Sequence, residues 1–320
     1  GLGSTRTYST HLAETWPVDG IILGTGGPQV WDFSSGPNDE TYQQEVFQAD
    51  EADGASEFPD AELVERSQYG SLDQPGWTFY RLTDDGRELH GFDDPIASPG
   101  SPIVKLDPAI IDFQEVMSFG AVWTTSTSFE SVIDLTDTPG LGKYPAVSNV
   151  EAQLEVDAYG TMLLPDLGEI DVLRINELTT TTSTAFVEGN PVALGDAYVR
   201  SFYWVSPGLG IVAQITSTAS SPVLNEPFPD NEFETAARFL RLTGGDSQPE
   251  PEIGIEVEVI GDFLSLSWEA VPGATVYEVL TSESLADESW QVLAAVGATQ
   301  FVHPMGNDTR FYKVEVAEPE

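Results

Sequence analysis

The chain contains no cysteine, few basic residues and no long apolar segment. Zero cysteines among 320 residues exclude disulfide bonds, thiolate nucleophiles and cysteine-ligated zinc. Stability must therefore come from a buried core, and a chain that is 40% hydrophobic and 10% aromatic can bury one. No apolar run reaches the roughly 18 residues of a membrane-spanning helix, so we expect no membrane insertion.

Acidic residues dominate the charge of the chain. Its 53 aspartates and glutamates face 12 lysines and arginines, which gives a formal net charge of −41 at pH 7. Nucleic acids and anionic membranes bind clustered Lys and Arg, so neither is an expected partner. An acidic, lysine-poor composition is typical of proteins in saline water, which predicts a secreted, extracellular or cell-surface location. The charge could serve solubility alone or the capture of divalent cations.

Catalytic signatures are also missing. His11, His90 and His303 lie far apart in the sequence and form no zinc-binding pair. Ser206 lies in a Val-Ser-Pro-Gly segment rather than a Gly-x-Ser-x-Gly elbow, which favours a turn over a nucleophile. Carboxylates are so numerous that the sequence cannot identify a glycosidase pair. The pattern predicts a protein that is not an enzyme.

The segments that are present predict an all-β protein. Residues 77–82 and 87–92 flank Asp84-Asp85-Gly86, a hairpin signal in which glycine supplies the positive φ of the turn. Frequent Gly and Pro between the strands favour an antiparallel sandwich or barrel-like domain. Residues 231–240 tolerate either a short helix or a strand. We expect further strands at residues 116–123, 131–135, 150–161, 170–178, 182–187, 198–205 and 209–216.

A Gly, Pro and Glu segment divides the chain. Residues 245–252 cannot form a core and favour an extended spacer. We therefore predict a β-rich domain at residues 1–244, this linker, and a small domain at residues 253–320.

The small domain carries a family resemblance. Leu264, Leu266 and Trp268 alternate to one face, Pro272-Gly273 makes a corner, and Tyr312, Val314 and Val316 alternate on a closing strand. Residues 263–274, 277–280 and 310–316 together resemble a bacterial fibronectin type III-like module. The resemblance implies a small β-sandwich that acts as a spacer or adhesive unit.

The larger domain has a looser resemblance. Residues 24–34, 156–165, 172–175 and 203–210 together are similar to a group of uncharacterised secreted β-rich bacterial surface proteins. This resemblance implies secretion and a β-rich fold, and it supplies no catalytic residues.

Two kinds of binding residue are candidates in the sequence. Asp84, Asp85, Asp93 and Asp94 surround a turn and could bind calcium, although aspartate also favours turns without metal. Trp16 and Trp290 lie in polar surroundings, where an indole could stack on a sugar ring.

These features favour a non-catalytic structural or adhesive protein of a bacterial surface. One form is a filament or surface-layer subunit in which residues 1–12 add to a neighbour's sheet, the alternative being an ordinary first strand of the same domain. A second class is a secreted carbohydrate-binding protein, aided by calcium or not. A third is a secreted glycoside hydrolase, which would need a cleft with two converging carboxylates.

The net charge gives the first testable prediction. Repulsion among the acidic groups opposes the compact state, so raising NaCl from 10 to 500 mM, or adding millimolar calcium, is expected to raise the melting temperature and to favour association. Thermal unfolding followed by circular dichroism measures this effect. A melting temperature that neither addition changes would contradict it.

Overall fold

A computed structural model gives the structure of the chain, which divides into two compact units, Gly1–Asp246 and Ser247–Glu320. Each unit is described by itself. The described residues are 3–22, 24–94, 103–134, 136, 142–165, 167–221, 233–245, 255–260, 263–268, 276–282, 291–304 and 311–316. Most of the predicted linker, residues 245–252, lies outside them.

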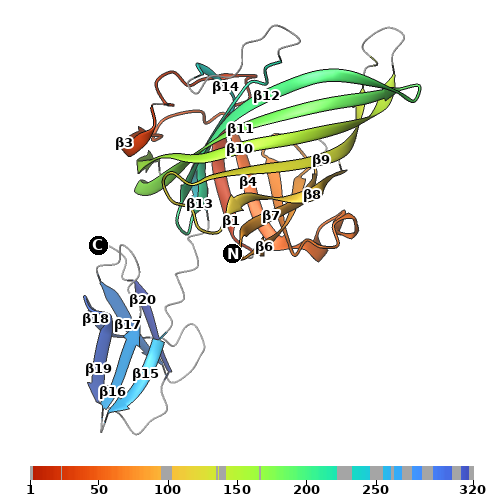
Figure 1. The fold of residues 1–320 in the computed structure, drawn as a ribbon. Helices are drawn as coiled ribbons and strands as arrows, with labels where there is room; N and C mark the ends of the chain where they lie inside the picture. Colours follow the sequence, from red (N-terminus) through yellow and green to blue (C-terminus); the bar gives the residue numbers. More distant parts are fainter. Residues whose placement is uncertain are drawn as a thin grey trace. The chain divides into compact units, whose positions relative to one another are not determined.

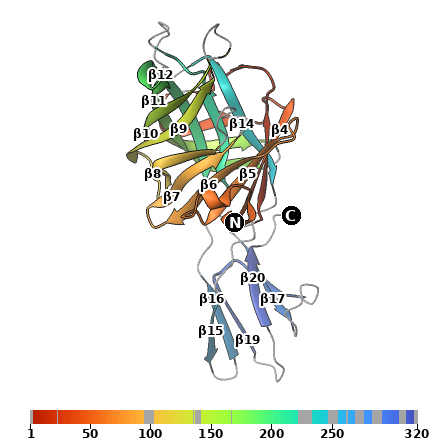
Figure 2. The same cartoon turned by 90° about the vertical axis from the view of Figure 1, so that its right-hand side faces the viewer.

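The large unit is a closed antiparallel sheet of twelve strands, shown in two orientations in Figures 1 and 2. Strands that follow one another in sequence are neighbours, and the first strand pairs with both β4 and β14, which closes the barrel. The strands are β1 (Thr5–Thr10), β4 (Glu40–Gln48), β5 (Leu63–Tyr69), β6 (Gly76–Thr83), β7 (Gly86–Asp93), β8 (Ile103–Gln114), β9 (Val122–Asp134), β10 (Lys143–Leu164), β11 (Gly168–Val187), β12 (Asn190–Ser206), β13 (Gly210–Ser217) and β14 (Thr235–Gly245).

Other short elements attach to this sheet. β2 (Trp16–Pro17) pairs with β14, and β3 (Gly26–Asp32) runs parallel to β10. Two 3-10 turns, η1 (Ala49–Glu51) and η2 (Ala55–Glu57), belong to a small apolar cluster with Phe58 and Phe79. Among the described residues, no helix is long and apolar enough to cross a membrane.

The close approach of β3 to β10 requires glycine. Gly160 has φ +157°, and a Cβ built on it would lie 1.9 Å from the carbonyl oxygen of Gln29. A Cβ on Gly27 would lie 2.2 Å from the carbonyl oxygen of Tyr159. Side chains at these positions would push the segments apart, so both glycines are needed for backbone contact.

A buried ion pair fastens the segment before β3 to the sheet. Arg174 Nε and a second guanidinium nitrogen donate to the two carboxylate oxygens of Asp157, at 2.8 and 3.0 Å, and both side chains are 2% exposed. Arg174 also donates to the carbonyl of Gly24 and lies over the rings of Trp31 and Phe202. The guanidinium is thus satisfied on its edge by oxygen and on its faces by aromatic rings.

The small unit contains two three-stranded sheets. One has the order β15-β16-β19 and the other β18-β17-β20. Leu266 and Trp268 from the first sheet share a core with Tyr277, Val279 and Val314 from the second. The strands are β15 (Ile255–Ile260), β16 (Phe263–Trp268), β17 (Tyr277–Ser282), β18 (Gln291–Val296), β19 (Gln300–Pro304) and β20 (Phe311–Val316).

The predicted all-β class is confirmed, with two corrections. Residues 116–121, predicted as the start of a strand, precede β9, because Ala121 and Ser118 form a turn that reverses the chain. Residues 235–245 form a strand, which removes the helical alternative for most of that segment. Residues 1–12 contain an ordinary strand whose two edges are both paired within the unit, so polymerisation through it would require strand exchange.

The Arg174–Asp157 pair gives the second testable prediction. Arg174→Met leaves a buried carboxylate without its cation and is expected to lower the free energy of unfolding by about 3–5 kcal/mol. Arg66→Met is the matched control, because Arg66 and Glu45 are 37% and 32% exposed and 3.9 Å apart, and its cost is expected to be about 0–1 kcal/mol. Urea unfolding measures both; equal losses would contradict the prediction.

Candidate functional site

Charged side chains point into the barrel from several strands. Arg6 of β1 donates to Glu65 of β5 at 3.1 Å, and Gln44 of the intervening strand β4 donates to the other carboxylate oxygen of Glu65 at 2.6 Å. The side chains of Arg6 and Glu65 alternate along their strands with side chains on the outer face, as the period of a strand requires. Glu65 is thereby an acceptor of two hydrogen bonds within the wall of the barrel.

A second ion pair lies beside the first. Arg87 of β7 binds Asp112 of β8 through two guanidinium nitrogens, with Nε 3.0 Å from Oδ1 and a second nitrogen 2.5 Å from Oδ2. The guanidinium also lies over the rings of Phe113 and Tyr80, 4.8 and 5.4 Å from their centroids. Burial raises the pKa of the Tyr80 hydroxyl to about 12, so Tyr80 stays neutral.

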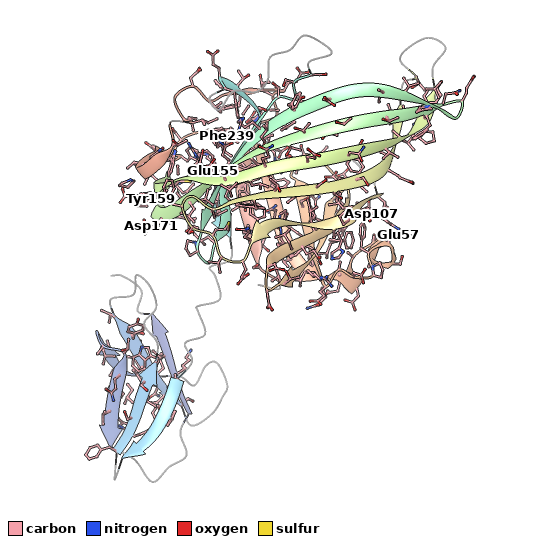
Figure 3. All side chains as sticks on the ribbon, viewed as in Figure 1. Glu57, Asp107, Glu155, Tyr159, Asp171 and Phe239 are labelled. Atoms are coloured by element: carbon pink, nitrogen blue, oxygen red, sulfur yellow. The ribbon has the colours of Figure 1, made fainter. Side chains whose placement is uncertain are left out.

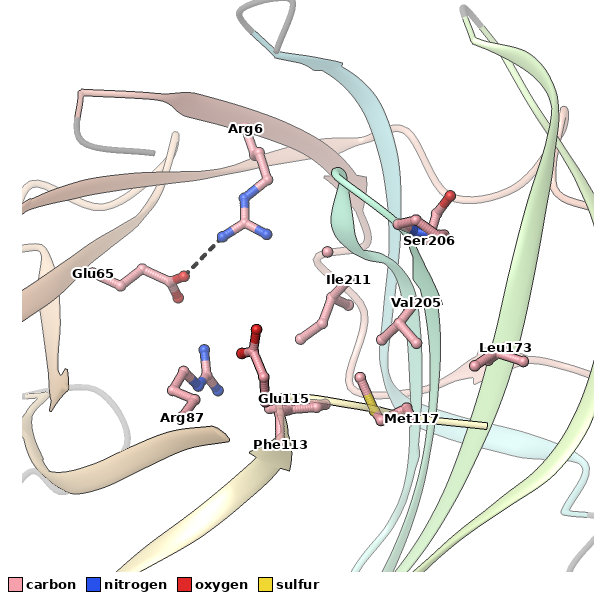
Figure 4. A pocket seen from close by; sticks show the side chains of 12 residues that line it. Arg6, Glu65, Arg87, Phe113, Glu115, Met117, Leu173, Val205, Ser206 and Ile211 are labelled. Carbon is pink, nitrogen blue, oxygen red and sulfur yellow. Dashed lines mark hydrogen bonds and ion pairs between the residues drawn. The ribbon is translucent and has the colours of Figure 1, made fainter. Parts of the chain in front are cut away.

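A cavity of about 360 Å³ opens next to these pairs (Figure 4). Its residues come from strands spread around the closed sheet, which places the cavity within the barrel. One side is charged and carries Arg6, Glu65, Arg87 and Glu115. The other side is apolar and is formed by Phe113, Met117, Leu173, Val205 and Ile211, together with the turn Ser206, Pro207 and Gly210.

Glu115 adds a negative charge to the cavity that its arginines do not balance. Arg6 is held by Glu65 and Arg87 by Asp112, whereas the structure records no side-chain partner for the Glu115 carboxylate among the described residues. Glu115 follows β8 and is exposed, and Figure 4 shows its carboxylate pointing into the cavity. The cavity therefore presents one carboxylate beyond those that neutralise its arginines.

A further acidic group lies deeper in the barrel. Glu177 of β11 accepts a hydrogen bond from Thr179 at 2.6 Å. Burial and the nearby charge of Asp112 raise the pKa of Glu177, against the opposing effect of hydrogen bonds from Thr179 and Tyr203. Burial also raises the pKa of Tyr203, with a smaller contribution from Glu177. Tyr203 meets Phe113 of β8 edge to face at 5.6 Å, so β8 and β12 approach each other across the lumen.

The predicted calcium ligands divide between the two ends of one strand. Asp84 and Asp85 lie in the β6–β7 turn, and Asp93 and Asp94 lie at the opposite end of β7. Burial and the charges of Asp94 and Asp53 raise the pKa of Asp93. In the part of the chain that the structure describes, no three acidic or histidine side chains are arranged to hold a metal ion. Calcium binding stays a prediction, which the calcium arm of the melting experiment addresses.

The other residues considered from the sequence form no catalytic or sugar-binding group at the cavity among the described residues. Trp16 is half-buried, packs on the main core and contacts the ring of His11 at 5.8 Å. Trp290 lies outside the described residues. Ser206 lines the cavity, but none of the three histidines does, so it has no imidazole base there.

Sequence reasoning missed the residues that form the cavity. Arg6, Glu65 and Arg87 each lie at an alternate position of a strand, which looks the same whether that face meets solvent or the lumen. One signal was available: basic residues are scarce in this chain, and Arg6 and Arg87 lie inside strands rather than in turns.

Glu177 gives the third testable prediction. Its raised folded-state pKa means that the folded protein keeps the proton to higher pH than the unfolded chain does, so this group costs stability as pH rises above the ordinary glutamate value. Glu177→Gln removes that cost and is expected to raise the melting temperature at pH 8, with the gain disappearing near pH 4. Glu169→Gln, exposed on the same strand, is the control and is expected to change neither value. A gain for Glu177→Gln that is equal at both pH values would contradict the prediction.

Comparisons with known proteins give no guide to function, so the cavity is the main one. No protein-family model, no curated protein and no solved structure matches this chain.

Proposed function

We propose that this is a non-catalytic extracellular binding protein whose barrel captures a small, positively charged, amphipathic molecule. The observation that carries the proposal is the cavity, in which the Glu115 carboxylate faces an apolar wall. Its volume of about 360 Å³ lies within the range of roughly 300–1,000 Å³ typical of small-molecule sites.

The charge of the ligand follows from the pairing of the cavity's ions. Both arginines are neutralised by carboxylates that accept their hydrogen bonds, so an anionic ligand would have to displace Glu65 or Asp112. A cation meets the free carboxylate of Glu115 without displacing either pair. The net charge of −41 also attracts cations to the protein from a distance.

The body of the ligand follows from the opposite wall. Met117, Leu173, Val205 and Ile211 offer apolar surface, and burying it against water favours binding by roughly 25 cal/mol per Å². An ammonium group joined to an aromatic or branched apolar group satisfies both sides of the cavity. The extracellular location and the role of the small unit as a spacer or adhesive module belong to the same proposal and rest on composition and on the fibronectin type III-like resemblance.

Carbohydrate binding receives less support from this cavity. Sugar rings stack on exposed aromatic faces, and among the described residues Phe113 is the only ring that lines the cavity. That ring already meets Tyr203 and the guanidinium of Arg87.

Glycoside hydrolysis is the second candidate, because Glu65 and Glu115 line the same cavity. A pair of carboxylates needs one member that donates a proton. Glu65 accepts hydrogen bonds from Arg6 and Gln44, which commits it to the acceptor role. Turnover of a panel of nitrophenyl glycosides that Glu115→Gln abolishes would favour this candidate over binding alone.

Calorimetry with three matched compounds tests the binding proposal. Phenylbutylammonium, phenylbutanol and phenylbutyrate share an apolar body and differ in charge, and we expect affinity to fall in that order. Glu115→Gln is expected to weaken binding of the cation by about tenfold, equivalent to ~1.4 kcal/mol. Glu151→Gln, exposed on β10, is the matched control and is expected to leave the affinity unchanged. Equal affinity for all three compounds, or binding by none, would overturn the proposal.

A further inference from the structure

The wall of the barrel is incomplete between β8 and β9. Asp107 and Ser128 are the one residue pair that joins these strands in the described sheet, whereas every other junction of the closed sheet extends over at least the four pairs that join β1 to β14. Two hydroxyl groups support the junction: Thr127 Oγ1 donates to the carbonyl of Pro108 at 2.6 Å, and Ser128 Oγ donates to the carbonyl of Asp107 at 3.0 Å.

An opening begins where the ladder stops. From Asp107 and Ser128, an unbroken antiparallel register would pair Ala109 with Ser126 and Ile110 with Thr125. These residues instead line a space of about 440 Å³, which we call the seam slot. Among the described residues, its lining is Asp85, Ala109, Ile110, Ile111, Gln114, Trp123, Thr124, Thr125 and Ser126.

Figure 3 helps to locate the slot on the barrel. It labels Asp107, which pairs with Ser128, on the same side as Glu57. It labels Glu155 toward the other end of the barrel, and Glu155 pairs with Val122 at the start of β9. The slot residues of β9 follow Val122 in the sequence and precede Ser128, so they lie between these two ends.

Both sides of the slot are edges of strands. β9 pairs with β10 along its whole length, and the residues of β8 that line the slot pair with β7 at Ile110, Ile111 and Gln114. In an antiparallel strand, alternate residues direct their N–H and C=O groups to the neighbour on one side, so the remaining groups of each edge point toward the slot. Trp123 also lines the slot, and its buried indole N–H has no acceptor among the described residues.

We propose that the seam slot binds an extended peptide segment of another protein, which adds as a strand to the free edges of β8 and β9. Main-chain hydrogen bonds supply affinity in this mode of recognition, and alternate side chains supply specificity. The two edges face each other, so the added strand would pair on both sides and complete the wall. This site is distinct from the cavity and does not depend on the function proposed for it.

The lining determines the chemistry of the peptide. Ile110, Ile111 and Trp123 offer apolar contacts, while Asp85 at the slot and Asp107 at the pair beside it are exposed acids. No lysine or arginine in the described part of the chain lines the slot. The structure therefore assigns to it a segment with apolar or β-branched residues in the middle and a basic residue near each end.

Hydrogen exchange with a designed peptide tests the proposal. The probe is acetyl-Lys-Val-Thr-Val-Lys-amide, added to the full chain at increasing concentration. Saturating peptide is expected to slow amide exchange in residues 109–114 and 123–127 and to leave the cavity segment of β11 unchanged. Slowed exchange only in β11 and β13, or no slowed exchange in any of these segments, would overturn the proposal.

Three controls separate strand addition from simple charge attraction. A peptide with alternate backbone amides methylated keeps its charge but loses donors, and it is expected not to bind; equal affinity would overturn the proposal. A peptide with Glu in place of Lys is expected to bind more weakly. Asp85→Asn should weaken the basic peptide by about two- to fivefold, whereas Asp84→Asn, next in sequence but outside the slot, should have no effect. If the free protein sediments as a dimer and the peptide dissociates that dimer, the occupant of the slot is a second copy of this chain. That result would overturn the assignment of the slot to a segment of another protein.

Discussion

Arginine buried against oxygen is the interaction on which the large unit depends. Eight of the nine arginines lie in the strands of the barrel with carboxylate, carbonyl or aromatic neighbours, and three of them, Arg174, Arg200 and Arg241, are buried. The eight are Arg6, Arg66, Arg81, Arg87, Arg174, Arg200, Arg238 and Arg241. A buried guanidinium is tolerated only when its donors are satisfied, because its desolvation costs several kcal/mol. Arg241 of β14 meets the same requirement, because it donates to the carbonyls of Phe33 and Ser34 and holds the chain that follows β3.

This use of arginine changes the meaning of the net charge. The paired groups inside the protein neutralise one another, as Arg174 does with Asp157 and Arg87 with Asp112. The remaining acids lie mostly at the surface, and few basic side chains remain there to balance them. Among the described residues, the uncompensated negative charge is therefore carried mainly by groups in contact with solvent. Salt screens such groups well, whereas it screens the buried pairs little.

The fold class could be predicted from the sequence because the information is local. The Asp84-Asp85-Gly86 turn and the alternation on either side of it specify a hairpin wherever it lies in the molecule, and β6 and β7 form it. Residues 170–178 and 182–187 were correctly assigned as strands but are one continuous strand, since the Thr-rich segment between them has high β-propensity and pairs with both β10 and β12. The turn at residues 118–121 was missed because Val116, Phe119 and Val122 are apolar yet exposed.

Neither site could be predicted, because each depends on contacts that are remote in sequence. Arg6 reaches Glu65 because β1 pairs with β4 and β4 pairs with β5, which brings together residues that lie 59 positions apart. The seam slot depends on where β8 and β9 stop pairing. The neighbouring Pro108 lacks an N–H group and cannot donate to a ladder, which is the one local signal for the break.

The cavity and the seam slot have a common physical origin. A barrel whose interior carries charged pairs cannot be filled as densely as an apolar core, because each guanidinium requires oriented partners and space around them. The same wall leaves an acid at each opening, Glu115 at the cavity and Asp85 at the slot. Because the surface is acidic as a whole, cationic groups are concentrated near both openings before they bind. The long-range charge thus brings a cation to the protein, and the apolar lining of each opening determines which cation stays.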